Sequence, residues 1–256
     1  MDKVTVAVLN YNGKDILPTC VESFRNQITD GFKIEIVVLD NASTDESYKL
    51  ANGEKVIHLD NKHKFITGLN AFVKLDAGYK IFVENDVILA KAAVLQLVNA
   101  YQPNSIIQPV ICHPEDGRIM HAGINFVWPG YGFAKKTLKW EVDVFATTCF
   151  MTDSSVLEKV GLFDENFAPA YYEDVDYSIR AKKLGVNLLL AKQAKAYHLA
   201  NFSFSKVMTK WQISEVCHRN REYVIKKHFK GLDRFLRLAT VRLLDSTIRP
   251  CFYDHK

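Results

Sequence analysis

The sequence lacks any apolar run long enough to cross a membrane, and it lacks paired cysteine motifs. No stretch approaches the ~18 consecutive apolar residues of a transmembrane helix, and polar residues interrupt the opening MDKVTVAVLN too early for a signal peptide. The five cysteines lie far apart without CxxC spacing, and one would be left over if the others paired. We therefore expect reduced thiols and a cytoplasmic protein without a membrane span.

A glycine-rich phosphate loop is also missing. Neither GxGxxG nor GxxxxGK[ST] follows the first apolar run, where YNGKD holds a single glycine. This argues against a Rossmann dinucleotide site and against a P-loop. A bound nucleotide would need another way to neutralise its diphosphate, and a divalent cation held by Asp86 is a natural candidate because hard cations take carboxylate oxygens.

What the sequence does contain is ample core material and an uneven charge. With 256 residues, 48% of them hydrophobic, the chain can form a large core, which excludes disorder as its main state. Residues 201–256 hold 12 Lys and Arg against 5 Asp and Glu, a local balance of +7 that leaves −3 for the first 200 residues. The chain is therefore a near-neutral to acidic body with a basic tail.

The order of apolar runs predicts an α/β fold. Short β-branched runs alternate with helical patterns through the first hundred residues, which is typical of a parallel sheet covered by helices. The expected strands are 4–10, 33–40, 55–60 and 79–86, and the expected helices are 15–27, 43–51, 67–77 and 90–101.

The second half follows another rhythm. Gly, Pro and aromatic residues in 113–150 favour hairpins and loops after a strand at 105–111. Next come helices at 154–161 and 171–185, strands at 186–191 and 194–199, and amphipathic helices at 204–229 and 232–245. We predict one domain over residues 1–200, with a basic amphipathic helical tail, residues 201–256, packed on it.

Polar residues follow the first four predicted strands. In open parallel sheets, ligands bind beyond the carboxyl ends of the strands, so these residues are candidates for a site. Any one of them could be a turn former or a helix cap, but four polar strand ends together favour a ligand site. The residues are Asn10, Asn12, Asp40, Asn41, Asp60, Asn61, Glu84, Asn85 and Asp86.

Three carboxylates, Glu173, Asp174 and Asp176, occupy four positions at the start of a predicted helix. Acids in a first helical turn are each stabilised by roughly 0.3–1 kcal/mol, so they could be ordinary helix-start chemistry. Asp176 could also pair with Arg180 four residues on. Taken alone, the pattern leaves a structural and a catalytic interpretation open.

Six segments of the sequence are informative when read together. They are VAVLNYNGKDILPTCVESF, VVLDNASTDES, NKHKFITGLNAF, FVENDVIL, FMTDSSVLEKVGLFDENFAPAYYEDVDYSIRAKKLG and AYH. Their order and spacing over residues 3–200 resemble the family 2 glycosyltransferases, and are most similar to the rhamnosyltransferase-like branch; the most specific block runs from GLFDENF through EDVDYSIR to AYH. The resemblance implies a GT-A fold, with a mostly parallel central sheet flanked by helices, a catalytic domain over residues 1–200 and a C-terminal helical extension.

The resemblance also implies the roles of site residues. Asp40 would accept the imide N–H of uracil or thymine, and Gly68 and Asn70 would lie at a helix start near the diphosphate. Asp86 matches the metal-binding aspartate, and His198 matches the distal histidine ligand of Mn²⁺ or Mg²⁺. The other nucleotide-binding residues would be Leu9, Asn10, Tyr11, Glu84 and Asn85, of which Glu84 and Asn85 depart from the commonest forms of their segment.

For the carboxylate cluster, the resemblance makes Asp174 the general base, Glu173 an acceptor-binding residue and Asp176 structural. We expect a helix-start aspartate to stay ionised at neutral pH, which suits a base. The implied function is a metal-dependent inverting glycosyltransferase that moves a sugar from a UDP- or dTDP-sugar to a hydroxyl acceptor in glycan or polysaccharide synthesis. Two alternatives are transfer to modified nucleic acid bases and a non-catalytic nucleotide-sugar-binding domain.

The basic tail has three interpretations. It could be a pair of amphipathic helices docked on the core, a contact with an anionic membrane that carries a lipid-linked acceptor, or a contact with nucleic acid phosphates. We favour a glycan or lipid-linked acceptor over nucleic acid, because the resemblance extends to family 2 enzymes that build surface polysaccharide. Location would then be cytoplasmic, either free or peripheral at the inner face of a membrane.

Overall fold

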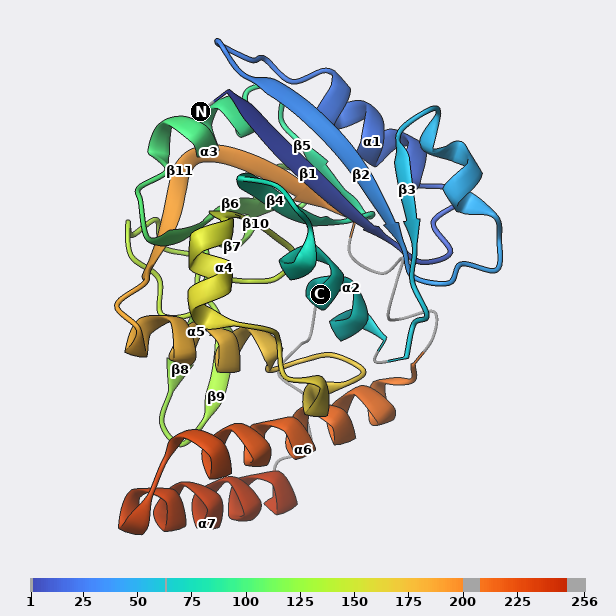
Figure 1. Ribbon diagram of the computed structural model, residues 1–256. Helices are drawn as coiled ribbons and strands as arrows, with labels where there is room; N and C mark the ends of the chain where they lie inside the picture. The colour runs from blue at the N-terminus through green and yellow to red at the C-terminus, as the bar shows by residue number, and fades with distance from the viewer. Residues whose placement is uncertain (1, 63, 200–207, 248–256) are drawn as a thin grey trace.

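The computed structural model describes residues 2–62, 64–199 and 208–247, and its centre is a nine-stranded sheet (Figure 1). The sheet order is β3-β2-β1-β4-β10-β6-β11-β5, with β7 paired to β6. Its strands are β1 (Lys3–Asn10), β2 (Lys33–Asp40), β3 (Lys55–His58), β4 (Tyr79–Glu84), β5 (Val87–Leu89), β6 (Ser105–Cys112), β7 (Ile119–His121), β10 (Cys149–Asp153) and β11 (Asn187–His198).

The sheet is mixed, with six of its nine strands pointing the same way. β1 pairs in parallel with β2 and β4, β2 with β3, and β6 with β11. β10 runs antiparallel between β4 and β6, so β6 points the same way as β4. The carboxyl ends of β1, β2, β3, β4, β6 and β11 consequently lie at one edge of the sheet.

Helices cover both faces, and each face has its own hydrophobic core. Along β1, Val4, Val6 and Val8 face one core while Ala7 and Leu9 face the other, as the two-residue period of a strand requires. α1 and α3 pack on the first face, and α2, α4 and α5 on the second (Figure 1). These helices are α1 (Leu17–Arg25), α2 (Phe65–Lys74), α3 (Ala93–Ala100), α4 (Ser154–Val160) and α5 (Glu173–Lys183).

Two local predictions are wrong. The predicted helix over 43–51 is only a 3₁₀ turn, η1 (Ser47–Ala51), because the Asp45 carboxylate accepts the backbone N–H groups of Lys14 and Ser47 and so competes with a regular helix. The two strands predicted at 186–191 and 194–199 form the single strand β11, whose register against β6 shifts between Ala191 and Lys195.

The segment between β6 and β10 forms a hairpin and loops, as predicted. The hairpin consists of β8 (Ile124–Val127) and β9 (Tyr131–Ala134). A second 3₁₀ turn, η2 (Glu165–Phe167), follows α4.

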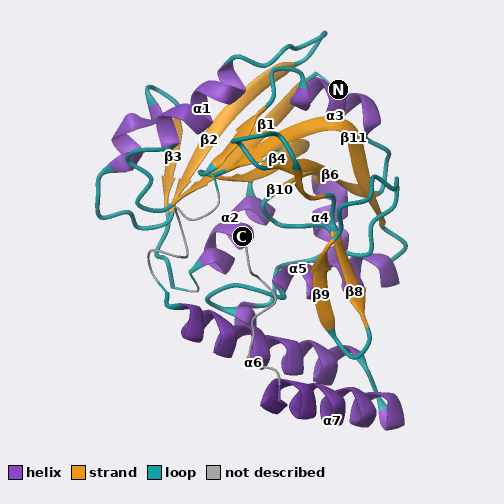
Figure 2. Ribbon diagram, turned by 180° about the vertical axis from the view of Figure 1, so that it is seen from behind, coloured by secondary structure: helices purple, strands orange, loops and turns teal. Residues whose placement is uncertain are grey.

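The tail forms an antiparallel pair of helices, α6 (Lys210–His228) and α7 (Gly231–Thr247), with α6 against the body and α7 outermost (Figures 1 and 2). Thr209 and Gln212 form a capping box at the start of α6. Parts of the predicted tail, residues 201–207 and 248–256, lie outside the described residues, as does Cys251.

The described cysteines, Cys20, Cys112, Cys149 and Cys217, are all buried and none is in a disulfide. In the described part of the chain, no helix combines the length and hydrophobicity that a bilayer-spanning segment needs.

Candidate active site

The polar strand ends meet at the carboxyl edge of the sheet. Asn10, Asp40 and Glu84 are the last residues of β1, β2 and β4, and His198 is the last residue of β11. The predicted gathering of strand-end side chains is therefore present. β3 ends earlier than expected, at His58, so Asp60 and Asn61 lie in the loop beyond it.

Glu84, Asp86 and His198 form a cluster in which one ligand atom from each lies within 4.8 Å of the others. The Nε2 atom of His198 is 3.3 Å from Oδ1 of Asp86. β5 brings these distant residues together, because it runs antiparallel beside β11 with Val87 opposite His198. The N–H of Leu199 also donates to the carbonyl of Asp86 at 2.9 Å, which fixes the turn between β4 and β5.

Two carboxylates and an imidazole are a suitable donor set for Mn²⁺ or Mg²⁺. Burial, together with the charges of Asp86 and Glu173, raises the pKa of Glu84 to about 8. Burial opposes protonation of His198, but the Asp86 and Glu84 carboxylates outweigh it and raise the pKa of the imidazole. Because the carboxylates repel each other here, a bound cation would relieve their repulsion, and the residues fit such an ion.

A network of buried amides joins the ends of β1, β2 and β4. The side-chain amide of Asn10 donates to Asp40 at 3.0 Å and to Ser47 at 2.8 Å, and the amide of Asn85 donates to Asn10 at 2.8 Å. Asn10 is fully buried, and Asp40 and Asn85 nearly so. Asn10 and Asn85 therefore hold Asp40 in place, while Tyr11, half-buried, follows at the end of β1.

His58 is a neighbour of Asp40 that sequence reasoning missed. Its Nδ1 atom is 3.2 Å from Oδ2 of Asp40, and its ring lies edge-on to Tyr48 with centroids 4.7 Å apart. The sequence feature that could have identified His58 was its position at the end of a strand that lies beside β2.

The expected diphosphate residues lie in α2. Gly68 packs against Leu9 so closely that an added Cβ would come within 2.2 Å of a Leu9 methyl group. α2 begins at Phe65, so Gly68 is its fourth residue, at the end of the first turn, and Asn70 lies in the second turn. The Asn70 amide both donates to and accepts from the backbone of Phe163, at 3.1 and 2.8 Å, and is fully used within the protein.

The start of α5 brings Glu173 and Asp174 together in a buried environment. Glu173 accepts a hydrogen bond from the hydroxyl of Thr147 at 2.9 Å, and the carbonyl of Thr148 accepts the N–H of Glu84 at 3.1 Å. The segment Thr147–Thr148 thus connects α5 to the cation cluster. Sequence reasoning missed it, and the short polar TT pair within an apolar run was the only signal.

Asp174 does not behave as the helix-start argument predicted. Burial, and then the charge of Glu173, raise the pKa of Asp174 well above that of an ordinary aspartate, although the Val175 N–H donates to it at 2.7 Å. Burial also raises the pKa of Glu173 to about 6. Desolvation therefore works against the ionised form that the helix-start argument predicted, and the helix N-terminus does not offset it.

Asp176 faces the tail. Its carboxylate lies 2.9 Å from Arg180, 2.8 Å from Lys227 and 2.7 Å from His228. The predicted pair with Arg180 forms, but Asp176 is buried rather than on the surface. This carboxylate joins α5 to α6.

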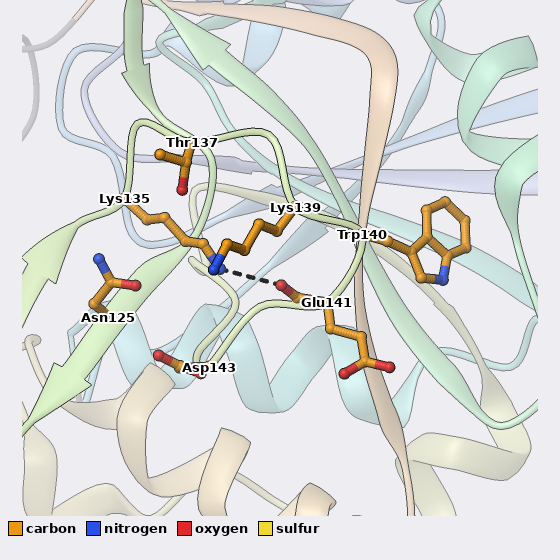
Figure 3. Close-up of a pocket in the computed structure, with 7 residues that line it drawn as sticks. All are labelled: Asn125, Lys135, Thr137, Lys139, Trp140, Glu141 and Asp143. Carbon is orange, nitrogen blue, oxygen red and sulfur yellow. Dashed lines mark hydrogen bonds between the residues drawn. The ribbon is translucent and has the colours of Figure 1, made fainter.

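A separate polar hollow of about 600 Å³ lies beside the β8–β9 hairpin (Figure 3). Lys135 and Lys139 point into it, and the Lys135 ammonium donates to the carbonyl of Glu141 at 3.1 Å. The N–H of Leu190 donates to the neighbouring carbonyl of Trp140, which places the hollow near the start of β11, far along the strand from His198. The hollow is therefore not part of the candidate site.

A family model described as "Glycosyl transferase family 2" matches residues 5–161. Among curated proteins, the PGL/p-HBAD biosynthesis glycosyltransferases of Mycobacterium bovis and Mycobacterium tuberculosis are 28% identical over 138 residues, which covers 49% of this chain. The chain aligns with half the length of these relatives.

Solved structures show the same architecture. GalNAc-T7, solved with UDP, GalNAc and Mn²⁺, superposes with a TM-score of 0.73 and 17% identity over 98% of this chain and 52% of that chain. The S. aureus TarS fragment in complex with UDP gives a TM-score of 0.59 and 17% identity over 96% of this chain and 72% of that one. The fold is GT-A, with a curled mixed sheet between layers of helices.

Proposed function

Since this chain belongs to glycosyl transferase family 2 and is a glycosyltransferase, we propose that it moves a sugar from a UDP- or dTDP-sugar to a hydroxyl acceptor with inversion at the anomeric carbon. The observation that carries the proposal is the meeting of Glu84, Asp86 and His198 at the carboxyl edge of the sheet. These residues would hold Mn²⁺ or Mg²⁺. A bound cation would neutralise the charge that develops on the departing diphosphate.

The nucleotide would lie along the ends of β1 and β2. Asp40, held by Asn10, would accept the imide N–H of the base, and Leu9 and Tyr11 would line the base and ribose. Two of the structural neighbours were solved with UDP, which supports a pyrimidine nucleotide donor. Gly68 and Asn70 would contribute to the diphosphate region through the position of α2, because the Asn70 side chain is engaged elsewhere.

Chemistry would occur beside α5. Asp174, in its ionised form, would remove the proton of the acceptor hydroxyl as that oxygen bonds to the anomeric carbon and the carbon–oxygen bond to the diphosphate breaks. Glu173 would orient the acceptor. Because burial disfavours the ionised form of Asp174, a cation bound at the neighbouring cluster would assist the base by lowering the pKa of this carboxyl.

The acceptor would be a glycan or a lipid-linked molecule. The curated relatives are named for PGL/p-HBAD biosynthesis, and membership of a rhamnosyltransferase-like branch would suit this role. Four buried thiols without disulfides support a cytoplasmic, reducing location. The tail would dock on the catalytic domain as part of one unit and contact the inner face of a membrane.

Release of free nucleotide from UDP- and dTDP-sugars tests the proposal. The wild type with Mn²⁺ should hydrolyse its donor slowly without acceptor, and chelation should stop the reaction. Asp174→Asn should bind the same donor with unchanged affinity but lose transfer, while the exposed control Asp116→Asn should behave as wild type.

Each alternative function predicts a different experimental result. A protein that binds donors but releases no nucleotide under any condition is a binding module. Activity on a nucleic acid acceptor that falls steeply with salt would replace the glycan acceptor. Near-normal turnover of Asp174→Asn would refute that residue as the base.

A further inference from the structure

α7 presents an exposed apolar face to solvent. Leu232, Leu236, Ala239 and Leu243 recur at intervals of four, three and four, so they share one face of the helix, and Phe235 lies next to them. Leu232, Phe235, Leu236 and Leu243 are 46–71% exposed. We call these five residues the α7 stripe.

The opposite side of α7 accounts for its attachment to the protein. Val241 is fully buried, and Asp245 accepts hydrogen bonds from Arg221 of α6 at 2.6 Å and from the hydroxyl of Tyr131 at 2.9 Å. The helix is therefore held by one side. These contacts come from the other side of α7, and an exposed apolar surface of this size on a helix needs its own explanation.

The charge of the residues around the α7 stripe indicates which kind of partner binds it. Residues 208–247 carry nine Lys and Arg against four Asp and Glu. Lys226, Arg234 and Arg242 on the helices and Lys230 between them are exposed, and Lys226 and Arg242 share the single carboxylate of Glu222, which leaves a net positive charge. A second copy of the chain would bring the same positive charge to the contact, whereas an anionic lipid surface complements both the apolar stripe and the charge.

We propose that the α7 stripe, with the basic side chains of α6 and α7, is an interfacial surface that docks on an anionic membrane with the outermost helix α7 (Figures 1 and 2) lying in the headgroup plane. The inference deepens the membrane contact proposed above and rests on that part of the proposed function. It assigns the contact to a defined face and places the acceptor in or beside the lipid surface.

Sedimentation with sucrose-loaded vesicles tests this surface. The wild type should sediment with vesicles of phosphatidylcholine and phosphatidylglycerol, less with phosphatidylcholine alone, and less again at high salt. The variant Leu236→Glu/Leu243→Glu should reduce binding to anionic vesicles by about tenfold or more. The matched control Leu162→Glu/Leu184→Glu adds the same charge at two exposed leucines on the body and should keep most of the binding.

Three results would overturn the proposal. The first is a wild type that stays in the supernatant with both vesicle types, and the second is an equal loss of binding in the two double variants. The third is a wild-type dimer that the Leu236→Glu/Leu243→Glu variant dissociates, with neither the wild type nor this variant binding lipid. Analytical ultracentrifugation measures the last. Donor hydrolysis without vesicles, measured on the same preparations, should be unchanged by either variant. Failure of hydrolysis would therefore count against the glycosyltransferase mechanism alone, and failure of vesicle binding against this surface alone.

Discussion

The side-chain amide of Asn220 in α6 donates to the carbonyl of Tyr171 at 2.7 Å, two residues before Glu173. The same amide group lies 3.0 Å from the carbonyl of Phe167 and 2.9 Å from that of Ala170. One buried side chain of the tail thus fixes the loop that leads into α5. Tyr171 and Tyr172 both have positive φ, 71° and 69°, a backbone conformation that needs such support.

Replacing Asn220 by Ala should therefore affect both stability and transfer. The carbonyls of Phe167, Ala170 and Tyr171 would lose the amide whose two N–H groups they share, which we expect to lower the free energy of unfolding by about 1–3 kcal/mol. A displaced α5 should reduce transfer by roughly tenfold or more, while donor affinity at the ends of β1 and β2 stays unchanged. Denaturant unfolding, initial transfer rates and nucleotide titration measure the three quantities.

The matched control is Asn26→Ala, which removes an exposed amide that bonds only to Glu22. It should leave all three quantities near wild type. If Asn220→Ala loses stability but transfers sugar at the normal rate, Asn220 supports the fold and does not position α5.

Gly13 is required by a close approach rather than by its backbone angles. An added Cβ would lie 2.3 Å from Nδ2 of Asn85 and 2.4 Å from Oδ1 of Asn10, between the two amides that hold Asp40. Gly13→Ala should break this pair, lower stability by about 1–3 kcal/mol and weaken nucleotide binding.

Gly78→Ala is the matched control, because an added Cβ there meets no atom within 4 Å. Thermal unfolding and nucleotide titration of the two variants should separate them clearly. Equal stability and equal affinity in both would show that the Asn10–Asn85 pair tolerates displacement.

The sequence predicted the ends of β1 and β2 correctly, because each is a β-branched run that stops at a polar residue, but it extended β3 and β4 two residues too far. The family resemblance predicted that Asp86 and His198 meet at one cation. The two side chains do lie together, and the β5–β11 ladder supplies the physical reason. That ladder could not be derived from the residues, since a three-residue strand carries little pattern of its own.

Burial and long-range contacts account for what the sequence did not predict. Helix position favours an ionised Asp174, but its degree of burial depends on residues far along the chain. Nothing in the pattern of α6 distinguishes Asn220 from a solvated asparagine, because its partners are backbone carbonyls. Glu84 was expected to contact nucleotide, and only the turn at Asn85 shows that it also reaches Asp86 and His198.

Cation binding should stabilise the wild type through the Glu84–Asp86–His198 cluster. A ligand that binds only the native state raises the free energy of unfolding by mass action, about 2.7 kcal/mol at a concentration a hundred times its Kd. Thermal shift with Mn²⁺ should therefore show an increase in the wild type that is lost in Asp86→Asn and in His198→Gln. Asp60→Asn, in the loop beyond β3, serves as the control and should retain the full shift.

A similar Mn²⁺ response in Asp86→Asn and in the wild type would place the ion elsewhere. An absent response in all proteins, even with a nucleotide sugar present, would contradict a resident cation. A parallel titration with Mg²⁺ compares the thermal shifts that the two candidate ions produce at Glu84, Asp86 and His198.

Asp164 should make stability depend on acidic pH. Burial opposes its ionisation, but the Lys227 ammonium at 2.6 Å, the Asn166 N–H and the Tyr223 hydroxyl lower its pKa from the usual 3.8 to about 2. A carboxyl whose pKa is lower in the folded state stabilises the fold above the unfolded pKa, and this stabilisation disappears as pH falls from about 4 to about 2. Partial solvent exposure reduces the contribution, which we put at about 1 kcal/mol near pH 7.

Asp164→Asn should consequently lower Tm by roughly 2–4 °C at pH 7, and the difference from wild type should shrink steadily below pH 4. Asp30→Asn, an exposed aspartate on the β2 side of the sheet, should show no such difference at any pH. Circular dichroism melts across pH 2–7 measure both variants. A constant gap between Asp164→Asn and wild type down to pH 2 would mean that lost packing, rather than the lost charge interactions with Lys227, destabilises the variant.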